Sequence, residues 1–483
     1  MRPTTPSTPC ARRRSLPAAA LGLALATAAL AATPMAGAHE LDALQASPQD
    51  DPVQALDSLA HDAVESGATV GLGLGVYRDG EPVLSEGYGK ADVENGVQAT
   101  DSTVFRVGSV TKQFTAAAIL KLGEDGALSL DDPITEFLPD YPEPGRDITV
   151  HHLLNHTAGI PNYTDMEAWQ ELMRHDLGHD EMLDVFADEP LEFEPGESFA
   201  YSNSGYYLLG LVIEEASGMA YDAYLQETFF EPLELGDTRY CWESPVIPNR
   251  ARGYQPAAAG EGENGIRNAD PVSMGQPYAA GALCSSVRDL ARWTEALHGG
   301  EVLAPESYDR MTTAAEMPEG ARMEYAYGLI LSDLEGIGRI GHGGGIPGFN
   351  AQLTYYPDEE LTVVTLVNLG GSAADEVAES AGQLVLGVEM PEVEDLPLEE
   401  GAPQRYVGTY DVQVLELEIF EEDGELMAQG EDQQAFRLLY QGDHEFRASF
   451  DPSVRLVFAV EDDRAESVTL HQAGAQFEGP RLR

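Results

Sequence analysis

The chain has 483 residues, of which 83 are Asp or Glu and 27 are Lys or Arg, so its formal net charge is −56. This charge argues against a nucleic-acid partner, because contacts to phosphates depend on Lys and Arg. Since 43% of the residues are hydrophobic, the chain can bury a large core, which excludes a disordered acidic protein. The length is consistent with two domains.

The first 38 residues have the pattern of an export signal. A basic start that includes Arg12–Arg14 is followed by an apolar stretch over 16–32, and small residues at 36–38 form a cleavage site before His39. The alternative is an uncleaved membrane anchor, but the apolar stretch is rich in Ala, contains Pro17 and is short for a span. We therefore expect a bacterial protein that is exported to the periplasm or secreted, with no stable membrane span once the signal is removed.

Loss of this signal would make the protein still more acidic. It removes four Arg and no acidic residue, so the remaining 445 residues would carry 83 acidic against 23 basic residues, or −60. Repulsion between so many carboxylates must be screened by counter-ions. The composition resembles that of proteins from salt-adapted bacteria, and the alternative is an acidic secreted protein with no salt requirement.

A flexible lead-in is predicted over 39–52, because this segment is polar and contains Pro. Two strands follow at 70–76 and 82–88, joined by a tight turn at 78–80. Three glycines alternate in the first strand, but the chain then turns back instead of entering a helix, which argues against a phosphate-binding loop.

The rest of residues 53–390 alternates between helical and strand patterns. Helices are predicted at 110–122, 166–175, 205–217, 287–298 and 374–386, and late strands at 325–332, 350–356 and 361–368. Strands at both ends with helices between them predict an α+β domain, in which one antiparallel sheet carries packed helices and an inserted helical region.

A second domain is predicted at the C-terminus. Residues 391–403 are acidic and proline-spaced, as in a semi-rigid linker. Over 404–483, seven short segments of alternating apolar and polar residues, the last at 467–472, are separated by Gly and Asp turns, which predicts a small all-β barrel. The sequence leaves open whether this barrel shields a site, binds a partner or supports a homodimer.

Ser109 and Lys112 form the first motif that indicates chemistry. They are three residues apart at the start of a predicted helix, so their side chains share one face, and the positive end of the helix dipole favours a serine alkoxide. A desolvated lysine beside a serine can accept the hydroxyl proton and make the serine a nucleophile. The alternative is a helix-capping serine next to a solvated lysine.

Two further motifs lie downstream. Tyr201 precedes Asn203 by two residues; a phenol near an ammonium group can have its pKa lowered enough to act as a general base, and the amide can hold a substrate carbonyl. His342 and Gly344 lie in a glycine-rich run over 341–348, at the start of a predicted strand, where a main-chain N–H can point at a developing oxyanion. Taken singly, a chance Tyr-x-Asn and a mobile glycine turn are competing interpretations.

Together and in this order, the three motifs resemble those of the serine β-lactamase and penicillin-recognising hydrolase superfamily, in its class C-like branch. Flanking segments such as 153–161, 195–203 and 281–290 are also similar to stretches of that family. The resemblance covers about residues 55–390. It implies that Ser109 forms an acyl-enzyme while Lys112 and Tyr201 move its proton.

The same resemblance assigns binding roles to the remaining residues. Asn203, His342 and Gly344 would bind the substrate, and the backbone N–H groups of Ser109 and Gly345 would form the oxyanion hole. The expected substrate is a small molecule or a short peptide, and neither a metal nor another cofactor is expected.

One departure from the family pattern bears on the substrate. Class C β-lactamases usually carry Lys-Thr-Gly where this chain has His342-Gly343-Gly344. Because an unperturbed histidine is largely uncharged near neutral pH, it offers no permanent charge for a penicillin carboxylate. Histidine in this position is similar to D,D-peptidases, D-aminopeptidases and esterases of the same superfamily, so the resemblance implies an esterase or a D-stereospecific peptidase. The alternatives are a class C-like β-lactamase and a penicillin-binding sensor that deacylates slowly.

Two cysteines, Cys241 and Cys284, remain after removal of the signal. In an oxidising compartment such a pair can form a disulfide. Two buried free thiols are the alternative, because the sequence does not give the distance between them.

Overall fold

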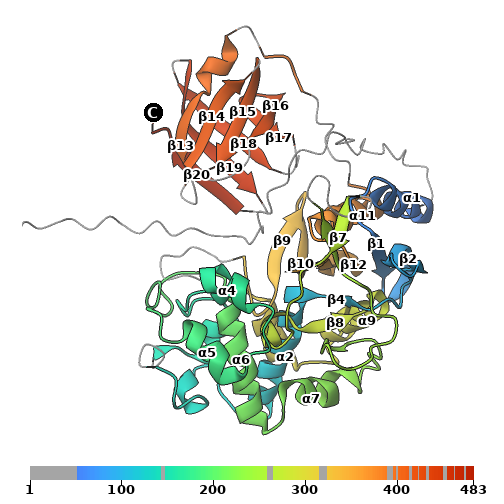
Figure 1. The fold of residues 1–483 in the computed structure, drawn as a ribbon. Helices are drawn as coiled ribbons and strands as arrows, with labels where there is room; N and C mark the ends of the chain where they lie inside the picture. Colours follow the sequence, from blue (N-terminus) through green and yellow to red (C-terminus); the bar gives the residue numbers. More distant parts are fainter. Residues whose placement is uncertain are drawn as a thin grey trace, which may run out of the picture. The chain divides into compact units, whose positions relative to one another are not determined.

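The computed structural model (Figure 1) describes residues 52–142, 147–257, 265–314, 324–388, 395–398, 401–412, 416–422, 424–430, 435–449, 454–461, 463–472 and 475–482. The predicted export signal and residues 39–51 of the predicted lead-in lie outside these residues. The chain divides into two compact units, with the division after Met390.

The first unit is built on a seven-stranded antiparallel sheet, which confirms the predicted α+β fold. Its strand order is β3-β2-β1-β12-β11-β10-β9, so the two ends of the unit meet at the centre, where Leu72 lies opposite Val367. The strands are β1 (Gly71–Arg78), β2 (Glu81–Asp92), β3 (Val97–Gln98), β9 (Ile330–Leu334), β10 (Ile337–Ile346), β11 (Phe349–Tyr356) and β12 (Leu361–Val367).

Helices cover both faces of this sheet. On one face, α1 (Pro52–Glu65) packs beside α11 (Ala373–Leu386) over a hydrophobic core (Figure 1). On the other face, α9 (Val287–His298) lies against β1 and β12. A Cβ atom at Gly73 or Gly75 would come within 2.7 and 2.3 Å of the Val287 side chain, so the alternating glycines of β1 make room for α9.

The inserted helical region holds the largest part of the core. Its central helices are α2 (Thr111–Glu124) and α6 (Asn203–Ser217), both with mostly buried residues. Ser202 caps α6 by accepting a hydrogen bond from the N–H of Gly205, and Gly218 ends it in the left-handed conformation. Around them lie α3 (Val150–Leu154), α4 (Glu167–Leu172), α5 (His179–Phe186), α7 (Tyr221–Leu225), α8 (Tyr278–Gly281) and α10 (Pro305–Thr312).

Several observed elements differ from the predicted ones. The strand predicted at 325–332 is displaced to β9, with only an isolated bridge between Tyr325 and Ile330 before it. The segment predicted as a lead-in gives its last residue, Pro52, to helix α1, which the sequence analysis did not predict. Three short strands, β4 (Phe105–Arg106), β8 (Leu283–Ser285) and β5 (Arg239–Tyr240), form a second small sheet. A further hairpin pairs β6 (Tyr254–Pro256) with β7 (Ile266–Asn268).

The second unit is a nearly closed antiparallel barrel of eight strands, one more than the seven segments predicted. They are β13 (Gly408–Asp411), β14 (Glu416–Glu422), β15 (Glu425–Gly430), β16 (Phe436–Gly442), β17 (Glu445–Ala448), β18 (Arg455–Glu461), β19 (Arg464–Gln472) and β20 (Ala475–Pro480). A bridge between Tyr410 and Arg481 brings the first strand next to the end of the last. Part of the predicted linker belongs to this unit, because the N–H of Leu396 donates to the carbonyl of Tyr440 at 2.9 Å.

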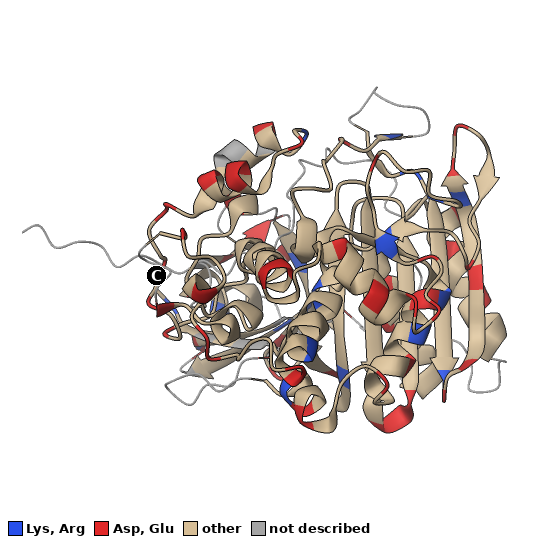
Figure 2. Ribbon diagram, turned by 90° about the horizontal axis from the view of Figure 1, so that it is seen from below, with Lys and Arg blue, Asp and Glu red and all other residues tan. Residues whose placement is uncertain are grey.

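Acidic residues are spread over the helices and loops, with few basic residues among them (Figure 2). Within the described ranges, no helix is both long enough and apolar enough to cross a bilayer.

Candidate active site

Ser109 lies in a 3-10 turn, Gly108–Val110, which leads directly into α2. Lys112 is in the first turn of α2, and its Nζ atom lies 3.1 Å from Oγ of Ser109. The spacing of three residues therefore does place the two side chains together. Ser109 is partly exposed, as a nucleophile must be, whereas Lys112 is fully buried.

The surroundings of Lys112 decide its charge. Its Nζ atom makes hydrogen bonds with Oδ1 of Asn203 and the carbonyl of Ala280, each at 2.8 Å. No ion pair among the described residues includes it, and burial holds the pKa of Lys112 well below its ordinary value. A neutral amine has two N–H groups for these two oxygens and a lone pair that can accept the Ser109 proton.

Tyr201 packs close to this pair, with Nζ of Lys112 4.8 Å from its ring centroid. Burial raises the pKa of Tyr201, and the hydrogen bond from Ser109 opposes this only in part. The expectation that the neighbouring amine lowers the pKa of this phenol was wrong, because burial lowers the charge on Lys112 as well and leaves no cation to stabilise a phenolate. Tyr201 is therefore a neutral hydroxyl, able to donate or relay a proton.

Asn203 is the first residue of helix α6, and both the oxygen and the nitrogen of its side-chain amide make hydrogen bonds. Oδ1 accepts from Lys112, while Nδ2 donates to the hydroxyl of Thr164 at 3.3 Å. Its backbone N–H donates to Oδ1 of Asn162 at 3.0 Å. These contacts fix the amide beside the nucleophile, where a substrate carbonyl would compete with Thr164 for the N–H donors.

His342 lies on β10 within the glycine-rich run, and its side chain is buried. Its Nδ1 atom lies 2.6 Å from the carbonyl of Gly343, which can only accept, so the proton is on Nδ1 and Nε2 accepts from the hydroxyl of Tyr325 at 3.1 Å. Burial is the largest cause that lowers the pKa of His342, to about 3. The imidazole is consequently neutral at physiological pH.

Gly344 and Gly345 bring the backbone of β10 against the nucleophile turn. A Cβ atom at Gly344 would lie 2.0 Å from the carbonyl of Val107 and 2.9 Å from the N–H of Ser109. A Cβ atom at Gly108 would lie 2.9 Å from the N–H of Gly345. Only residues without side chains permit this approach, which places the N–H groups of Ser109 and Gly345 in one small region.

Most of the glycine-rich run, from Gly341 to Ile346, is part of strand β10. It pairs with β11 from Ile340 to Ile346, whereas its pairing with β9 ends at Gly341. Among the described residues, the stretch from His342 to Ile346 therefore has one edge without a neighbouring strand, and the nucleophile turn packs against this stretch.

Sequence reasoning missed two residues that complete the site. Tyr325 holds His342, and its ring lies 4.6 Å from that of His156. His156 is buried, accepts from the N–H of Ser202 through Nδ1 at 3.1 Å, and lies 4.4 Å from the ring of Tyr201. His156 stands in one of the flanking segments that carry the family resemblance, and no pattern in the sequence links Tyr325 to His342.

The two cysteines are neighbours in the small sheet, where Cys284 lies on β8 and Cys241 follows β5. Both are buried free thiols in the structure, so the disulfide that their even number allows is not formed in it. A hydrogen bond from Cys284 lowers the pKa of Cys241.

The sequence and the fold of the chain are similar to those of known proteins. A family model described as "Beta-lactamase" matches residues 56–386. Penicillin-binding protein 4* of Bacillus subtilis (strain 168) is 27% identical over 429 residues, which cover 84% of this chain and 93% of that protein.

Two solved structures have a similar fold. The octameric penicillin-binding protein homologue from Pyrococcus abyssi matches with a TM-score of 0.61 and 26% identity, over 88% of this chain and 99% of that one. The D-amino acid amidase from Ochrobactrum anthropi SV3, complexed with L-phenylalanine amide, matches with a TM-score of 0.63 and 27% identity, over 70% and 99% of the two chains.

Proposed function

Because the chain belongs to the Beta-lactamase family, we propose that it is an exported serine hydrolase that cleaves an ester or a D-amino-acid-containing amide through an acyl-serine intermediate. The observation that carries this proposal is the distance of 3.1 Å between Oγ of Ser109 and Nζ of Lys112, an amine whose pKa burial holds well below its ordinary value. A neutral amine at this distance is a general base for the serine hydroxyl.

In the acylation step, Oγ of Ser109 attacks the carbonyl carbon while its proton moves to Nζ of Lys112. The negative charge that forms on the carbonyl oxygen is stabilised by the N–H groups of Ser109 and Gly345. When the intermediate collapses, the bond to the leaving alcohol or amine breaks, and that group takes the proton through Tyr201. Water then attacks the acyl ester with Lys112 again as base, which releases the acid and restores Ser109.

The neutral state of His342 supports an ester or amide over a penicillin. A penicillin carries a carboxylate, and an uncharged imidazole, with Nδ1 already bonded to Gly343, offers it no cation. An amide or ester substrate without that carboxylate needs none. The similarity to a D-amino acid amidase supports a D-configured acyl group, and the basic and apolar start of the sequence supports export.

A substrate panel tests this proposal. The protein and its Ser109→Ala variant are mixed, in molar salt, with a short p-nitrophenyl ester, with D- and L-phenylalanine p-nitroanilide, and with a chromogenic cephalosporin. We expect turnover of the ester or the D-anilide that is lost in the variant, and little turnover of the cephalosporin. A cephalosporin hydrolysed faster than every other compound would favour the β-lactamase alternative, and a stable adduct without turnover would favour the sensor.

A further inference from the structure

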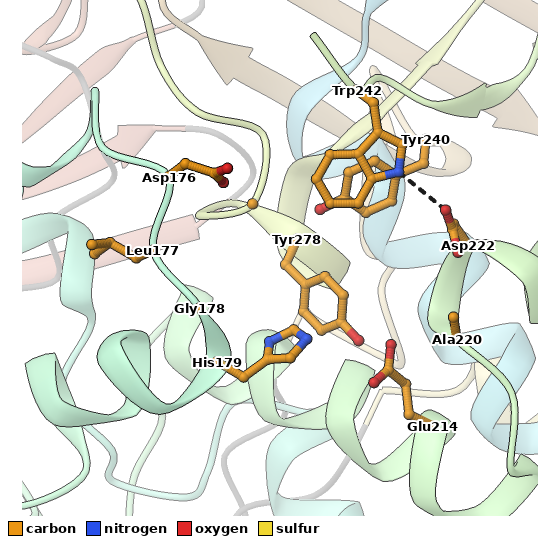
Figure 3. Close-up of a pocket in the computed structure, with 11 residues that line it drawn as sticks. Asp176, Leu177, Gly178, His179, Glu214, Ala220, Asp222, Tyr240, Trp242 and Tyr278 are labelled. Carbon is orange, nitrogen blue, oxygen red and sulfur yellow. Dashed lines mark hydrogen bonds between the residues drawn. The ribbon is translucent and has the colours of Figure 1, made fainter. Parts of the chain in front are cut away.

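A cavity of about 170 Å³ lies at the end of α6, and none of the candidate active-site residues lines it (Figure 3). The hydroxyl of Tyr278 faces the carboxylate of Glu214, and Nε1 of Trp242 donates to Oδ2 of Asp222 at 3.0 Å. Because these polar side chains face one another, the cavity needs no ligand to satisfy them. His156 in the active site differs, since its Nε2 atom is buried without a partner among the described residues.

The backbone of His156 has a conformation that residues with side chains rarely adopt. His156 follows Asn155, the residue that ends α3, and its φ angle is +60°. Glycine adopts this left-handed conformation without strain, whereas a residue with a Cβ atom loses stability there. Such strain persists only where the surrounding contacts compensate for it, and it occurs most often at functional sites.

His156 contacts the chain on both sides of Tyr201. Its carbonyl accepts from the N–H of Ala200 at 3.0 Å, and its Nδ1 atom accepts from the N–H of Ser202 at 3.1 Å. Between these two hydrogen bonds, the imidazole packs on the ring of Tyr201, with 4.4 Å between the ring centroids and 39° between the planes. The opposing contact of Tyr325, 4.6 Å from the imidazole, fixes the imidazole in turn.

The nitrogen atoms of His156 show what only a histidine supplies at this position. Burial holds the pKa of His156 well below its ordinary value, so its ring is uncharged near neutral pH. Because Nδ1 accepts from Ser202, the ring proton is on Nε2, where an unpaired buried donor destabilises the fold. A phenylalanine would fill this space without that donor, so the specific contribution of the histidine is the Nδ1 acceptor.

Tyr201 must be placed accurately because of its part in the proposed reaction, where its hydroxyl makes a hydrogen bond with Ser109. When the tetrahedral intermediate collapses, the bond from carbon to the leaving oxygen or nitrogen breaks and that atom keeps the electron pair. The proton that Lys112 took from Ser109 then reaches this atom through the Tyr201 hydroxyl. Ethanol or an amine leaves only with such a proton, whereas p-nitrophenolate leaves as an anion.

We propose that His156 is a positioning residue for Tyr201: it holds the Ser202 N–H and the Tyr201 ring, so that the Tyr201 hydroxyl stays within reach of the leaving group. This inference rests on the proposed function, in which Tyr201 transfers the leaving-group proton. It adds a residue that acts on the reaction only through Tyr201.

Two esters of one acid test this role, D-phenylalanine ethyl ester and D-phenylalanine p-nitrophenyl ester, with the background rate of Ser109→Ala subtracted. In His156→Phe, which loses the acceptor for Ser202, we expect kcat/KM to fall about 30-fold for the ethyl ester and no more than about threefold for the p-nitrophenyl ester. In a Tyr201→Phe background, His156→Phe should cause no further loss, because the two residues act as a unit.

His298 provides a matched control at the end of α9. Its Nδ1 atom makes a hydrogen bond with the hydroxyl of Tyr308 at 2.8 Å, so His298→Phe loses a comparable contact far along the chain from the site. We expect His298→Phe to keep the wild-type ratio of the two rates. If circular dichroism shows that His156→Phe does not fold, His156→Ala removes the same acceptor, needs less space and should change the ratio in the same direction.

Three results would overturn the proposal. The first is an equal fall in both rates in the His156 variants, which indicates general damage to the fold. The second is a full additional loss when His156→Phe is combined with Tyr201→Phe. The third is a wild-type protein that cleaves the p-nitrophenyl ester but not the ethyl ester, because no leaving-group proton would then be transferred. Failure of the proposed function is distinct from these results, since the wild-type protein would then cleave neither ester.

Discussion

Replacement of Lys112 by Met tests whether this amine is neutral in the folded protein. Lysine in an unfolded chain titrates near 10.5, and burial lowers the pKa of Lys112 well below that value. Between the folded and unfolded pKa values, the unfolded chain binds one proton more than the folded chain. The free energy of unfolding therefore rises with pH by about 1.4 kcal/mol per unit from this residue. Methionine fills the same space without a proton, so at each pH between the two pKa values the wild-type protein should gain about 1.4 kcal/mol per pH unit relative to Lys112→Met.

Urea denaturation of the full-length protein at pH 7, 8 and 9, in molar salt, measures this difference in the free energy of unfolding of the first unit. Lys121 on the same helix supplies the control, because an ion pair with Glu124 raises its pKa and keeps it protonated in both states over this range. Lys121→Met should therefore follow the wild-type pH dependence. If Lys112→Met also follows it, Lys112 is charged in the folded protein, and its role as the base is refuted.

Three further outcomes are expected. His342→Gln should raise KM without adding or removing an ionisation between pH 5 and 8, because the pKa of His342 is about 3; a lost step near pH 6.5 in the pH–rate profile would contradict this. Gly344→Ala should lower kcat/KM at least 100-fold, since its Cβ atom would meet the carbonyl of Val107, whereas Gly338→Ala on the same strand has open space and should retain activity in the same assay. The melting temperature, followed by calorimetry, should rise with sodium chloride up to molar concentrations, because counter-ions screen the repulsion of a −56 charge; a melting temperature independent of salt would argue for an ordinary acidic protein.

The sequence was sufficient for those parts of the site where residues lie close together along the chain. Ser109 and Lys112 share a helix face, so a spacing of three residues already predicts their contact. The central strands were also predictable, because β12 is a nearly continuous apolar run, and all of its residues are buried.

Other parts depend on packing that no local pattern reveals. The carbonyl of Ala280 holds Lys112 from 168 residues away, and a backbone carbonyl has no distinguishing side chain. Tyr325 meets His342 only because the chain before β9 turns back toward β10. The direction of the Tyr201 pKa shift depends on burial, which was not known before the fold.

Glycine patterns were the hardest to interpret. The run around Gly343 has low strand propensity and was compatible with a mobile turn, yet it is a strand because its backbone pairs with β11 and must approach Ser109 closely. The eighth barrel strand was missed for a similar reason, since β20 ends in Gly479-Pro480 and has few apolar residues.

Mapping of an acyl adduct tests the central claim most directly. The protein is mixed with a short p-nitrophenyl ester, quenched in acid within the first turnover, and examined by intact and peptide mass spectrometry beside Ser109→Ala. The account predicts one acyl group per chain on the peptide that contains Ser109, and none on the variant. Full hydrolysis with no adduct at any time, or an adduct that persists in the variant, would contradict it.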